Sequence, residues 1–345
     1  MKIIIATTFE PFVSGGDAVL ADSLETMLRR AGHKVETLRL PFQPCAPEML
    51  DQMLGLRLFD VSHAGDRLIA IRTPSYLLRH PHKILWFIHH HRGAYDFWGT
   101  PYGDLPDTPE GRRLRDSIRS ADNRAFAEAR AIFTNSRLVS ERLRQFNGVM
   151  SETLYPPLLD AERFVSREYG DSIVYVSRLV RHKRQHLAIE AMAHTRTPVQ
   201  LVIAGPANDA VYSAELESLA SREGVCDRVR LIPGWISEEV KQDLLSTSLG
   251  ALYLPVDEDS YGYAALEAQQ ASKAVITTTD SGGALELIAS EKNGLVVKPE
   301  PKAIAGAMDR LYEDRKLAIR LGTHGPVRIA ELGITWENIL RKLLA

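Results

Sequence analysis

The stretch DSYGYAALE, residues 259–267, begins and ends with a carboxylate. Paired carboxylates are typical of glycoside hydrolases, where one acts as an acid and the other as a base or nucleophile. An ionised carboxylate also accepts hydrogen bonds from vicinal hydroxyls, so the pair equally suits a hydroxyl-rich ligand that is held in place. The intervening residues predict a loop that enters a helix, with Glu267 about a turn and a half inside it.

The start of this expected helix has the features of an anion site. Asp259 or Ser260 can cap the helix. The backbone amides of the following residues are then left to point at an anion, and these residues are Tyr261, Gly262 and Tyr263.

Two cations stand five positions apart in VSRLVRHKRQHLAIEAM, where a strand gives way to a helix. Arg178 and Lys183 at such a junction suit a diphosphate, and the alternative is a solvated basic turn. Glycine pairs follow two other expected strands, and they are Gly15 with Gly16 and Gly282 with Gly283. Amides at such a turn can hold a phosphate, although a plain tight turn explains the first pair equally well.

The run WFIHHHRGAYDFW, residues 86–98, contains three adjacent histidines. Successive side chains of a strand point to opposite faces, so these three rings are not expected to bind one metal ion. One explanation of this run is histidines that pack at the end of a strand, beside the aromatic residues Tyr95, Phe97 and Trp98.

Composition limits the class of protein. The chain has 345 residues, 45% of them hydrophobic, and a formal net charge of -2, which gives no reason to expect a nucleic-acid partner. Only Cys45 and Cys226 occur, without metal-site or disulfide spacing, so a reducing cytosol is expected.

No run of about 18 apolar residues is present, so we expect a cytoplasmic protein, or one bound peripherally to the inner face of a membrane. A basic helical face supports the membrane alternative, although it also suits a solvated helix or an anionic acceptor. It consists of Arg112, Arg115 and Arg119.

Strands and helices alternate along both halves of the chain. The expected strands cover residues 2–8, 34–40, 59–65, 83–91 and 131–136, then 171–179, 198–205, 228–235, 250–256, 273–279 and 294–299. A proline-containing segment at 152–160 separates the two series. This pattern predicts two open α/β sheets, with a ligand beyond the carboxyl ends of their strands and in the cleft between the domains.

These motifs together resemble the retaining glycosyltransferase family 4, over almost the whole chain. The family's Glu-x7-Glu signature appears as Asp259 to Glu267, and its phosphate-binding pair as Arg178 and Lys183. Further similar segments are the GG-x-x-E turn ending at Glu286, the NGLVV segment at 293–297, the glycine turn at Gly15 and Gly16, and the closing TWENIL with Trp336.

The resemblance implies a GT-B fold, in which two Rossmann-like open-sheet domains face each other. Residues 1–158 would form an acceptor-side domain and residues 159–328 a nucleotide-sugar domain, and a helix in 329–345 would pack back on the first. It also implies a metal-independent hexosyl transfer, without a cofactor, from a UDP- or GDP-linked sugar to a glycan or glycolipid acceptor in polysaccharide biosynthesis. Glu267 would hold the ribose hydroxyls, and Asp259 would position the transferred sugar. Similar family members have a histidine at the end of this first-domain strand, so His90 and His91 are candidates for contact with the sugar and the acceptor. The aromatic residues Tyr95, Phe97 and Trp98 would then shape the acceptor side.

Two residues depart from the family pattern. Asp259 is one methylene shorter than the family glutamate, and the preceding Glu258 can take over its role. Arg184 stands where the family has glycine, so it either adds charge near the diphosphate or points into solvent. The alternative functions are a sugar-nucleotide epimerase, a GT-B phosphorylase and a non-catalytic subunit that binds a sugar nucleotide.

Overall fold

The computed structural model describes residues 1–11, 15–44, 48–100, 102–207 and 209–345. The chain divides into two compact units, Met1–Pro156 with Thr335–Ala345, and Pro157–Ile334. The first change of unit lies two residues before the expected boundary at 158. The second lies beyond the expected boundary at 328, because helix α11 (Arg315–Glu331) runs through that position.

The first unit is built on one parallel sheet in the order β2-β1-β3-β4-β5-β6. Its strands are β1 (Lys2–Phe9), β2 (Lys34–Pro41), β3 (Arg67–Ala70), β4 (Lys83–Phe87), β5 (Ala131–Thr134) and β6 (Glu152–Thr153). Its helices are α1 (Gly16–Arg30), α2 (Met49–Leu58), α3 (Pro109–Ala127), α4 (Arg137–Asn147) and α12 (Trp336–Leu343).

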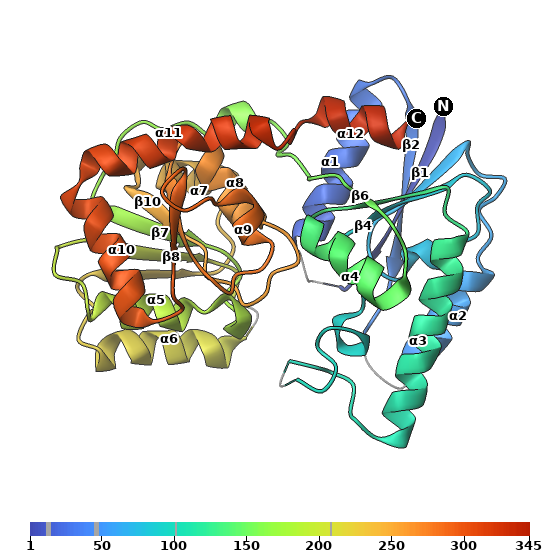
Figure 1. Ribbon diagram of the computed structural model, residues 1–345, viewed down its shortest axis with the longest axis horizontal. Coiled ribbons are helices and arrows are strands. Elements are labelled where there is room, and N and C mark those ends of the chain that lie inside the picture. The colour runs from blue at the N-terminus through green and yellow to red at the C-terminus, as the bar shows by residue number, and fades with distance from the viewer. Residues whose placement is uncertain (12–14, 45–47, 101, 208) are drawn as a thin grey trace. The chain divides into compact units, whose positions relative to one another are not determined.

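Both faces of this sheet are covered, which explains the nearly continuous apolar runs of its strands. In β1, Ile3 and Ile5 belong to an apolar cluster with α1 and α12, and Ile4 belongs to a second cluster with α2, α3 and α4. Figure 1 shows α12 beside α1, although about 300 residues separate them in the chain. Trp86 of β4 meets Trp336 of α12 edge to face, with ring centroids 6.4 Å apart.

One expected strand is wrong. Residues 59–65 form no strand beyond a single bridge at Asp60, and the sheet instead takes up β3, which starts two residues later. The reason is burial: Leu68, Ile69 and Ala70 are fully buried between β1 and β4, whereas the segment FDVSHAG alternates with polar side chains. A central parallel strand must be apolar on both of its faces.

The second unit repeats the design with the order β12-β11-β10-β7-β8-β9, again parallel throughout. Its strands are β7 (Ser172–Val176), β8 (Gln200–Gly205), β9 (Val229–Pro233), β10 (Gly250–Leu252), β11 (Ala274–Thr278) and β12 (Gly294–Val297). Its helices, besides α11, are α5 (Gln185–Met192), α6 (Ala210–Arg222), α7 (Glu238–Thr247), α8 (Tyr263–Gln270), α9 (Ala284–Leu287) and α10 (Pro301–Glu313).

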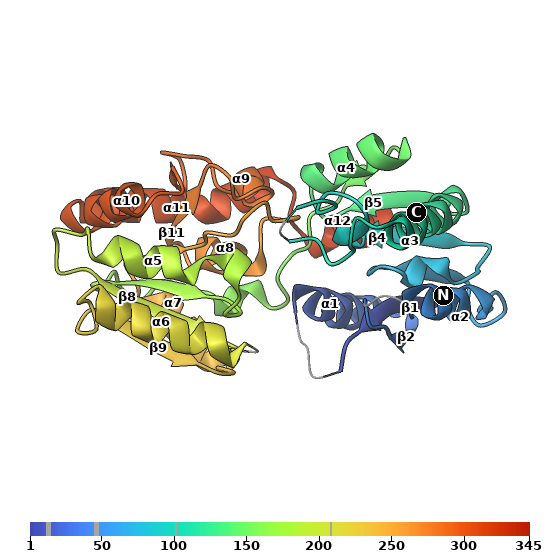
Figure 2. The same cartoon turned by 90° about the horizontal axis from the view of Figure 1, so that it is seen from below.

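Helices cover both faces of the second sheet as well. Helices α5, α6 and α10 pack on one face, and α7, α8 and α11 pack on the other (Figures 1 and 2). From β7 the chain adds β8 and β9 on one side, and it then returns to add β10, β11 and β12 on the other side of β7. The strand order therefore reverses between the neighbouring strands β7 and β10. Open parallel sheets bind ligands beyond the carboxyl ends of the strands at such a switch point.

No helix in the described ranges has both the length and the apolar composition needed to span a bilayer.

Candidate functional site

The loops that follow β7 and β10 meet at the switch point of the second sheet. After β7, the chain passes Arg178 and forms a short 3-10 turn, Arg181–Lys183, before α5 begins. The hydroxyl of Tyr175 connects this turn to the segment after β10, because it donates to the Lys183 carbonyl and accepts from the Leu254 amide at 3.0 Å. The structure therefore brings the predicted basic pair next to the acidic loop after β10.

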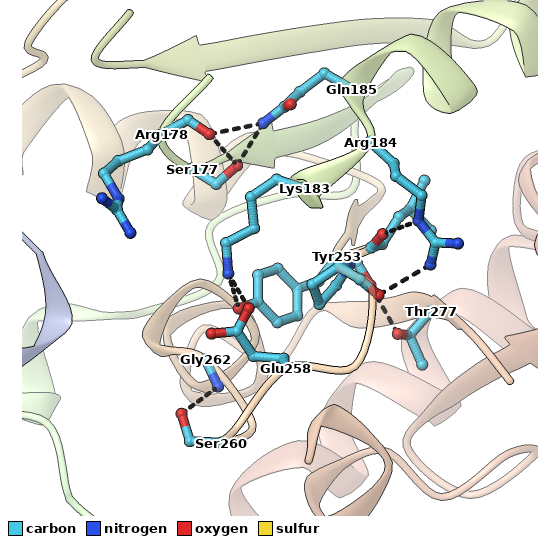
Figure 3. A network of polar contacts seen from close by, with 12 residues as sticks. Ser177, Arg178, Lys183, Arg184, Gln185, Tyr253, Glu258, Ser260, Gly262 and Thr277 are labelled. Atoms are coloured by element: carbon cyan, nitrogen blue, oxygen red, sulfur yellow. Dashed lines mark hydrogen bonds and ion pairs between the residues drawn. The ribbon is translucent and has the colours of Figure 1, made fainter. Parts of the chain in front are cut away.

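Lys183 is buried, and its ammonium is held by two partners from that acidic loop (Figure 3). It forms an ion pair with Glu258 and donates to the Tyr253 hydroxyl at 3.0 Å. Burial and the charge of Glu258 raise the pKa of Tyr253 well above its usual value, so this phenol stays neutral. The carboxylate next to Lys183 is thus Glu258, whereas Asp259 remains partly exposed one residue further on.

Arg178 takes a different direction from the same loop. Figure 3 shows its side chain extending away from Lys183 and Glu258. Its backbone is held in place, because the side-chain amide of Gln185 donates to the Arg178 carbonyl at 2.8 Å. Within the described residues its guanidinium makes no hydrogen bond or ion pair, so it can accept an anionic ligand without first giving up a partner.

Three glycines let the acidic loop pack closely. Gly262 has φ +74°, and a Cβ there would lie 2.2 Å from the Tyr253 hydroxyl. A Cβ on Gly282 would lie 2.6 Å from the backbone of Glu258, and one on Gly283 would lie 2.8 Å from that of Ser260. The predicted glycine pair therefore supports the loop that carries Glu258.

The expected cap of α8 is wrong. Gly262 is the N-cap residue, and no side chain caps the helix, because the Ser260 hydroxyl accepts instead from the Gly262 amide at 3.3 Å. A helix start without a side-chain cap has amides directed outward, and its dipole favours an anion. The predicted anion site of Tyr261, Gly262 and Tyr263 is thus compatible with the observed backbone.

Arg184 neither adds charge toward a ligand nor points into solvent, which corrects both alternatives drawn from the sequence. Its side chain is buried and donates to the carbonyls of Leu254 and Pro255, at 2.7 and 2.9 Å. It also donates to Thr278 at 2.8 Å and forms two hydrogen bonds of 2.8 Å with Asp280. Its φ of 55° lies in the left-handed region, which explains why glycine suits this position.

Replacing Arg184 by glycine is expected to lower the free energy of unfolding by about 2 kcal/mol. Glycine relieves the left-handed backbone, worth about 1 kcal/mol, but it removes a buried, charge-assisted network worth more. Urea denaturation of the variant beside Arg181→Ala, whose guanidinium is exposed and pairs with Glu215, checks this. A glycine variant as stable as the wild type would show that the network contributes nothing net.

Glu267 has a partner that the sequence did not reveal. It is the fifth residue of α8, buried, and it forms a 2.6 Å ion pair with Lys241 of α7. Lys241 also pairs with Glu238 at 2.9 Å. Burial raises the pKa of Glu267, and the charge of Lys241 opposes this rise. No spacing in the sequence signals this pair, because 26 residues separate its members.

The first unit places its predicted residues at its own switch point, between β1 and β3. Gly15 is the N-cap of α1 and Gly16 its first residue, while residues 12–14 before them lie outside the described ranges. Asp17 in the first turn pairs with Arg72, which follows β3, at 2.8 Å. The positive end of α1 therefore already has a carboxylate beside it, balanced by a guanidinium.

His90 is packed within the first unit. Its ring lies among aromatic side chains, with the centroid of Tyr95 4.1 Å away, and its Nε2 contacts the Asn147 side-chain oxygen at 2.8 Å. Burial lowers the pKa of His90 to about 4, so the ring is neutral at physiological pH. Tyr95 also points inward and donates to buried Asp122 at 2.8 Å. This position differs from the expectation that Tyr95 shapes the acceptor side.

His91 and Phe97 line a pocket of about 220 Å³ beyond the ends of β3 and β4. The Nε2 of His91 lies 3.3 Å from Asp104, a residue that the sequence did not single out. Gly93 makes room for this carboxylate, since a Cβ there would lie 1.7 Å from Oδ1 of Asp104. His89 and His90 also line the pocket.

The basic face of α3 is largely engaged within the unit. Arg112 pairs with Asp107 at 2.6 Å, Arg115 stacks on Trp98, and Arg119 lies over the Tyr95 ring. Trp98 is accordingly covered on one face. These contacts hold the three arginines against the first unit, and contact of this face with an anionic surface stays a prediction.

Among the described residues, no group of three or more His, Cys, Asp or Glu side chains is arranged to hold a metal ion.

Comparison with known proteins covers both units. Residues 160–328 match the family model described as glycosyl transferases group 1. D-inositol 3-phosphate glycosyltransferase of Corynebacterium urealyticum is 29% identical over 180 residues, which cover 50% of this chain and 41% of that protein. A GDP-mannose-dependent alpha-(1-6)-phosphatidylinositol monomannoside mannosyltransferase of Mycobacterium tuberculosis is 26% identical over 349 residues, or 94% of this chain and 85% of that protein. The chain thus matches less than half the length of the first of these relatives.

A crystal structure of Anabaena Alr3699/HepE in complex with UDP and glucose has the same fold. It superposes with a TM-score of 0.72 at 17% sequence identity, and the match covers 99% of each chain. The expected fold class, GT-B with two parallel open sheets, is confirmed by this comparison.

Proposed function

Because residues 160–328 match the family model described as glycosyl transferases group 1, we propose that this chain is a retaining glycosyltransferase with a nucleoside diphosphate sugar as donor. The transferred sugar passes to a hydroxyl of a glycan or glycolipid precursor. One observation carries the proposal: Arg178 and Lys183 follow β7, α8 with Glu267 follows β10, and these two strands meet at the switch point of one parallel sheet.

These groups match the parts of such a donor. The two cations and the first-turn amides of α8 suit the diphosphate, which carries two negative charges. Glu267 suits the ribose, because a carboxylate accepts hydrogen bonds from both vicinal hydroxyls. Lys241 would keep Glu267 ionised despite its burial. The names of the similar proteins mention GDP-mannose and UDP, so either nucleotide fits the proposal.

The chemistry required of the residues is electrostatic. The bond between the anomeric carbon and the diphosphate oxygen breaks, and a bond from that carbon to the acceptor oxygen forms. Lys183, Arg178 and the α8 amides stabilise the negative charge on the departing diphosphate, while the sugar carries oxocarbenium character. The diphosphate must share Lys183 with Glu258 or displace that carboxylate.

Retention follows from the resemblance to family 4. The acceptor attacks the face from which the diphosphate leaves, and its hydroxyl proton passes to the departing phosphate oxygen. This route needs neither a raised carboxyl pKa nor a covalent glycosyl-enzyme intermediate. Asp259 would contact the transferred sugar, and Glu258 is the second candidate for that contact.

The proposal is tested by thermal shift with UDP, GDP, ADP and their hexose conjugates. A ligand at about 100 times its dissociation constant stabilises the folded state by roughly 2.7 kcal/mol. We expect one nucleotide series to stabilise the chain. NMR of products formed from that donor and a set of hydroxyl acceptors should then show an unchanged anomeric configuration.

Three other results would redirect the proposal. If no nucleotide stabilises the chain, the donor site is wrong. Epimerised or phosphorolysed sugar formed without an acceptor would favour an epimerase or a phosphorylase. Donor binding without turnover on any acceptor would favour a non-catalytic subunit.

A further inference from the structure

The pocket of the first unit lies at the carboxyl ends of β3 and β4, the position at which parallel sheets bind ligands. Its volume of about 220 Å³ is smaller than the roughly 300–1,000 Å³ of pockets for drug-sized ligands, so it admits about one ring at a time. Phe97 and Tyr102 form part of its wall, with centroids 5.6 Å apart. Aromatic walls suit the C–H face of a sugar or cyclitol ring.

The arginines at this pocket already face carboxylates. Arg72 pairs with Asp17 at 2.8 Å, and Arg92 forms two contacts with one oxygen of Asp96, at 2.5 and 2.7 Å. Asp96 also lies 3.5 Å from Arg142, so the two arginines share that carboxylate.

Two further observations limit the positive charge at this pocket. His90, part of its lining, is uncharged at physiological pH because burial lowers its pKa. The eight residues outside the described ranges include no arginine, lysine, histidine, aspartate or glutamate. An anionic ligand would therefore have to compete with carboxylates that already face these arginines, at a cost in binding free energy.

Asp104 is the carboxylate of the lining that remains open to a ligand. Its side chain is 48% exposed, and its Oδ1 lies 3.3 Å from Nε2 of His91 without the alignment of a good hydrogen bond. Burial works against ionisation, but the nearby His91 outweighs it and lowers the pKa of Asp104. An ionised carboxylate accepts hydrogen bonds from hydroxyls and repels phosphate.

We propose that this pocket holds the acceptor by a neutral polyhydroxylated ring, that Asp104 binds vicinal hydroxyls of that ring, and that the pocket selects against a phosphate on it. The inference rests on the proposed function, since it names the acceptor class for the same reaction. It would distinguish this chain from a relative named for inositol 3-phosphate.

The test compares neutral and phosphorylated forms of the same rings. Ligand-observed NMR titrations of the full chain use three pairs: methyl glucoside and glucose 6-phosphate, methyl mannoside and mannose 6-phosphate, and myo-inositol and its monophosphate. In at least one pair we expect the neutral form to bind about tenfold or more tightly. The proposal is overturned if no neutral ring binds, or if the phosphorylated form binds more tightly in each pair that binds.

Substitutions then locate the effect. Asp104→Asn should weaken the neutral ring about tenfold, because hydrogen bonds to a charged acceptor are the stronger kind, and it should leave phosphate binding unchanged or improved. Gly93→Ala should act similarly, since its Cβ would occupy the position of the Asp104 carboxylate. Asp107→Asn is the matched control, because Asp107 is exposed, pairs with Arg112 and does not line the pocket.

Nucleotide stabilisation of the second unit is measured on each variant as a check on folding. Unchanged neutral-ring affinity in Asp104→Asn, with nucleotide stabilisation intact, would refute the role of Asp104 alone. If no nucleotide stabilises the wild type, the proposed function is refuted, whatever the pocket binds.

Discussion

Replacing Lys183 by alanine is expected to lower kcat for glycosyl transfer by about 100- to 1,000-fold. Lys183 is a buried cation at the switch point of the second sheet, and its charge would oppose the charge that develops on the diphosphate. Loss of one fixed electrostatic group aimed at a developing charge typically costs about this factor. Steady-state kinetics with the nucleotide sugar found by thermal shift would measure it.

Lys302→Ala is the control for Lys183, because Lys302 is an exposed lysine of α10 in the same unit. Circular dichroism separates lost chemistry from lost folding, since the alanine variant leaves Glu258 without this cation. A folded Lys183→Ala enzyme with kcat near that of the wild type would remove Lys183 from the mechanism.

Replacing Glu267 by alanine is expected to weaken binding of the nucleoside diphosphate about 100-fold. Two hydrogen bonds from ribose hydroxyls to a charged carboxylate contribute about 1.5–3 kcal/mol each, and about 1.4 kcal/mol corresponds to a factor of ten. Isothermal titration with the preferred nucleotide measures the change. The wild type should bind the 2′-deoxynucleotide more weakly than the ribonucleotide. The Glu267→Ala variant should bind the two nucleotides with nearly equal affinity.

Two further variants isolate the role of Glu267. Glu267→Gln keeps the shape of the side chain, so it should fold well and still bind the nucleotide weakly. Glu238 is half-exposed and is the other carboxylate that pairs with Lys241. Glu238→Gln removes this carboxylate and should leave nucleotide affinity nearly unchanged. Full affinity in both Glu267 variants would place the ribose elsewhere.

The acidic loop after β10 shows why residue type alone was an incomplete guide. The sequence offered Asp259 as the first carboxylate and Glu258 as its substitute. In the structure, Glu258 is the one that reaches Lys183, and the loop that presents it packs on Gly282 and Gly283. Which of two neighbouring acids faces a given cation depends on loop geometry, and sequence spacing does not specify it.

The histidine run shows the same limit. Strand alternation was sufficient to argue against one metal site for all three rings. It did not reveal that His90 would be enclosed by aromatic side chains, nor that Asp104 would lie beside His91. Both contacts come from the loop between β4 and α3 or from other elements, and no local pattern encodes them.

Local sequence patterns were sufficient to predict the α/β class, ten of the eleven expected strands, and the placement of Arg178 and Lys183 where a strand passes into a helix. These features depend on hydrophobic periodicity and on turn and helix propensities, which act over a few residues. The expected strand at 59–65 was wrong because this segment alternates with polar side chains. The next segment, β3, is apolar on both of its faces and occupies the central position in the sheet.

Contacts between side chains of different elements depend on the three-dimensional fold. The pairs Lys241 with Glu267 and Lys183 with Glu258, and the anchoring of Arg184 on Asp280, join residues 26 to 96 positions apart. Such contacts are fixed by sheet order and by the packing of helices on the sheet. The same cause explains why Arg184, a charged residue at a glycine position, is buried: its partners come from the ends of two neighbouring strands.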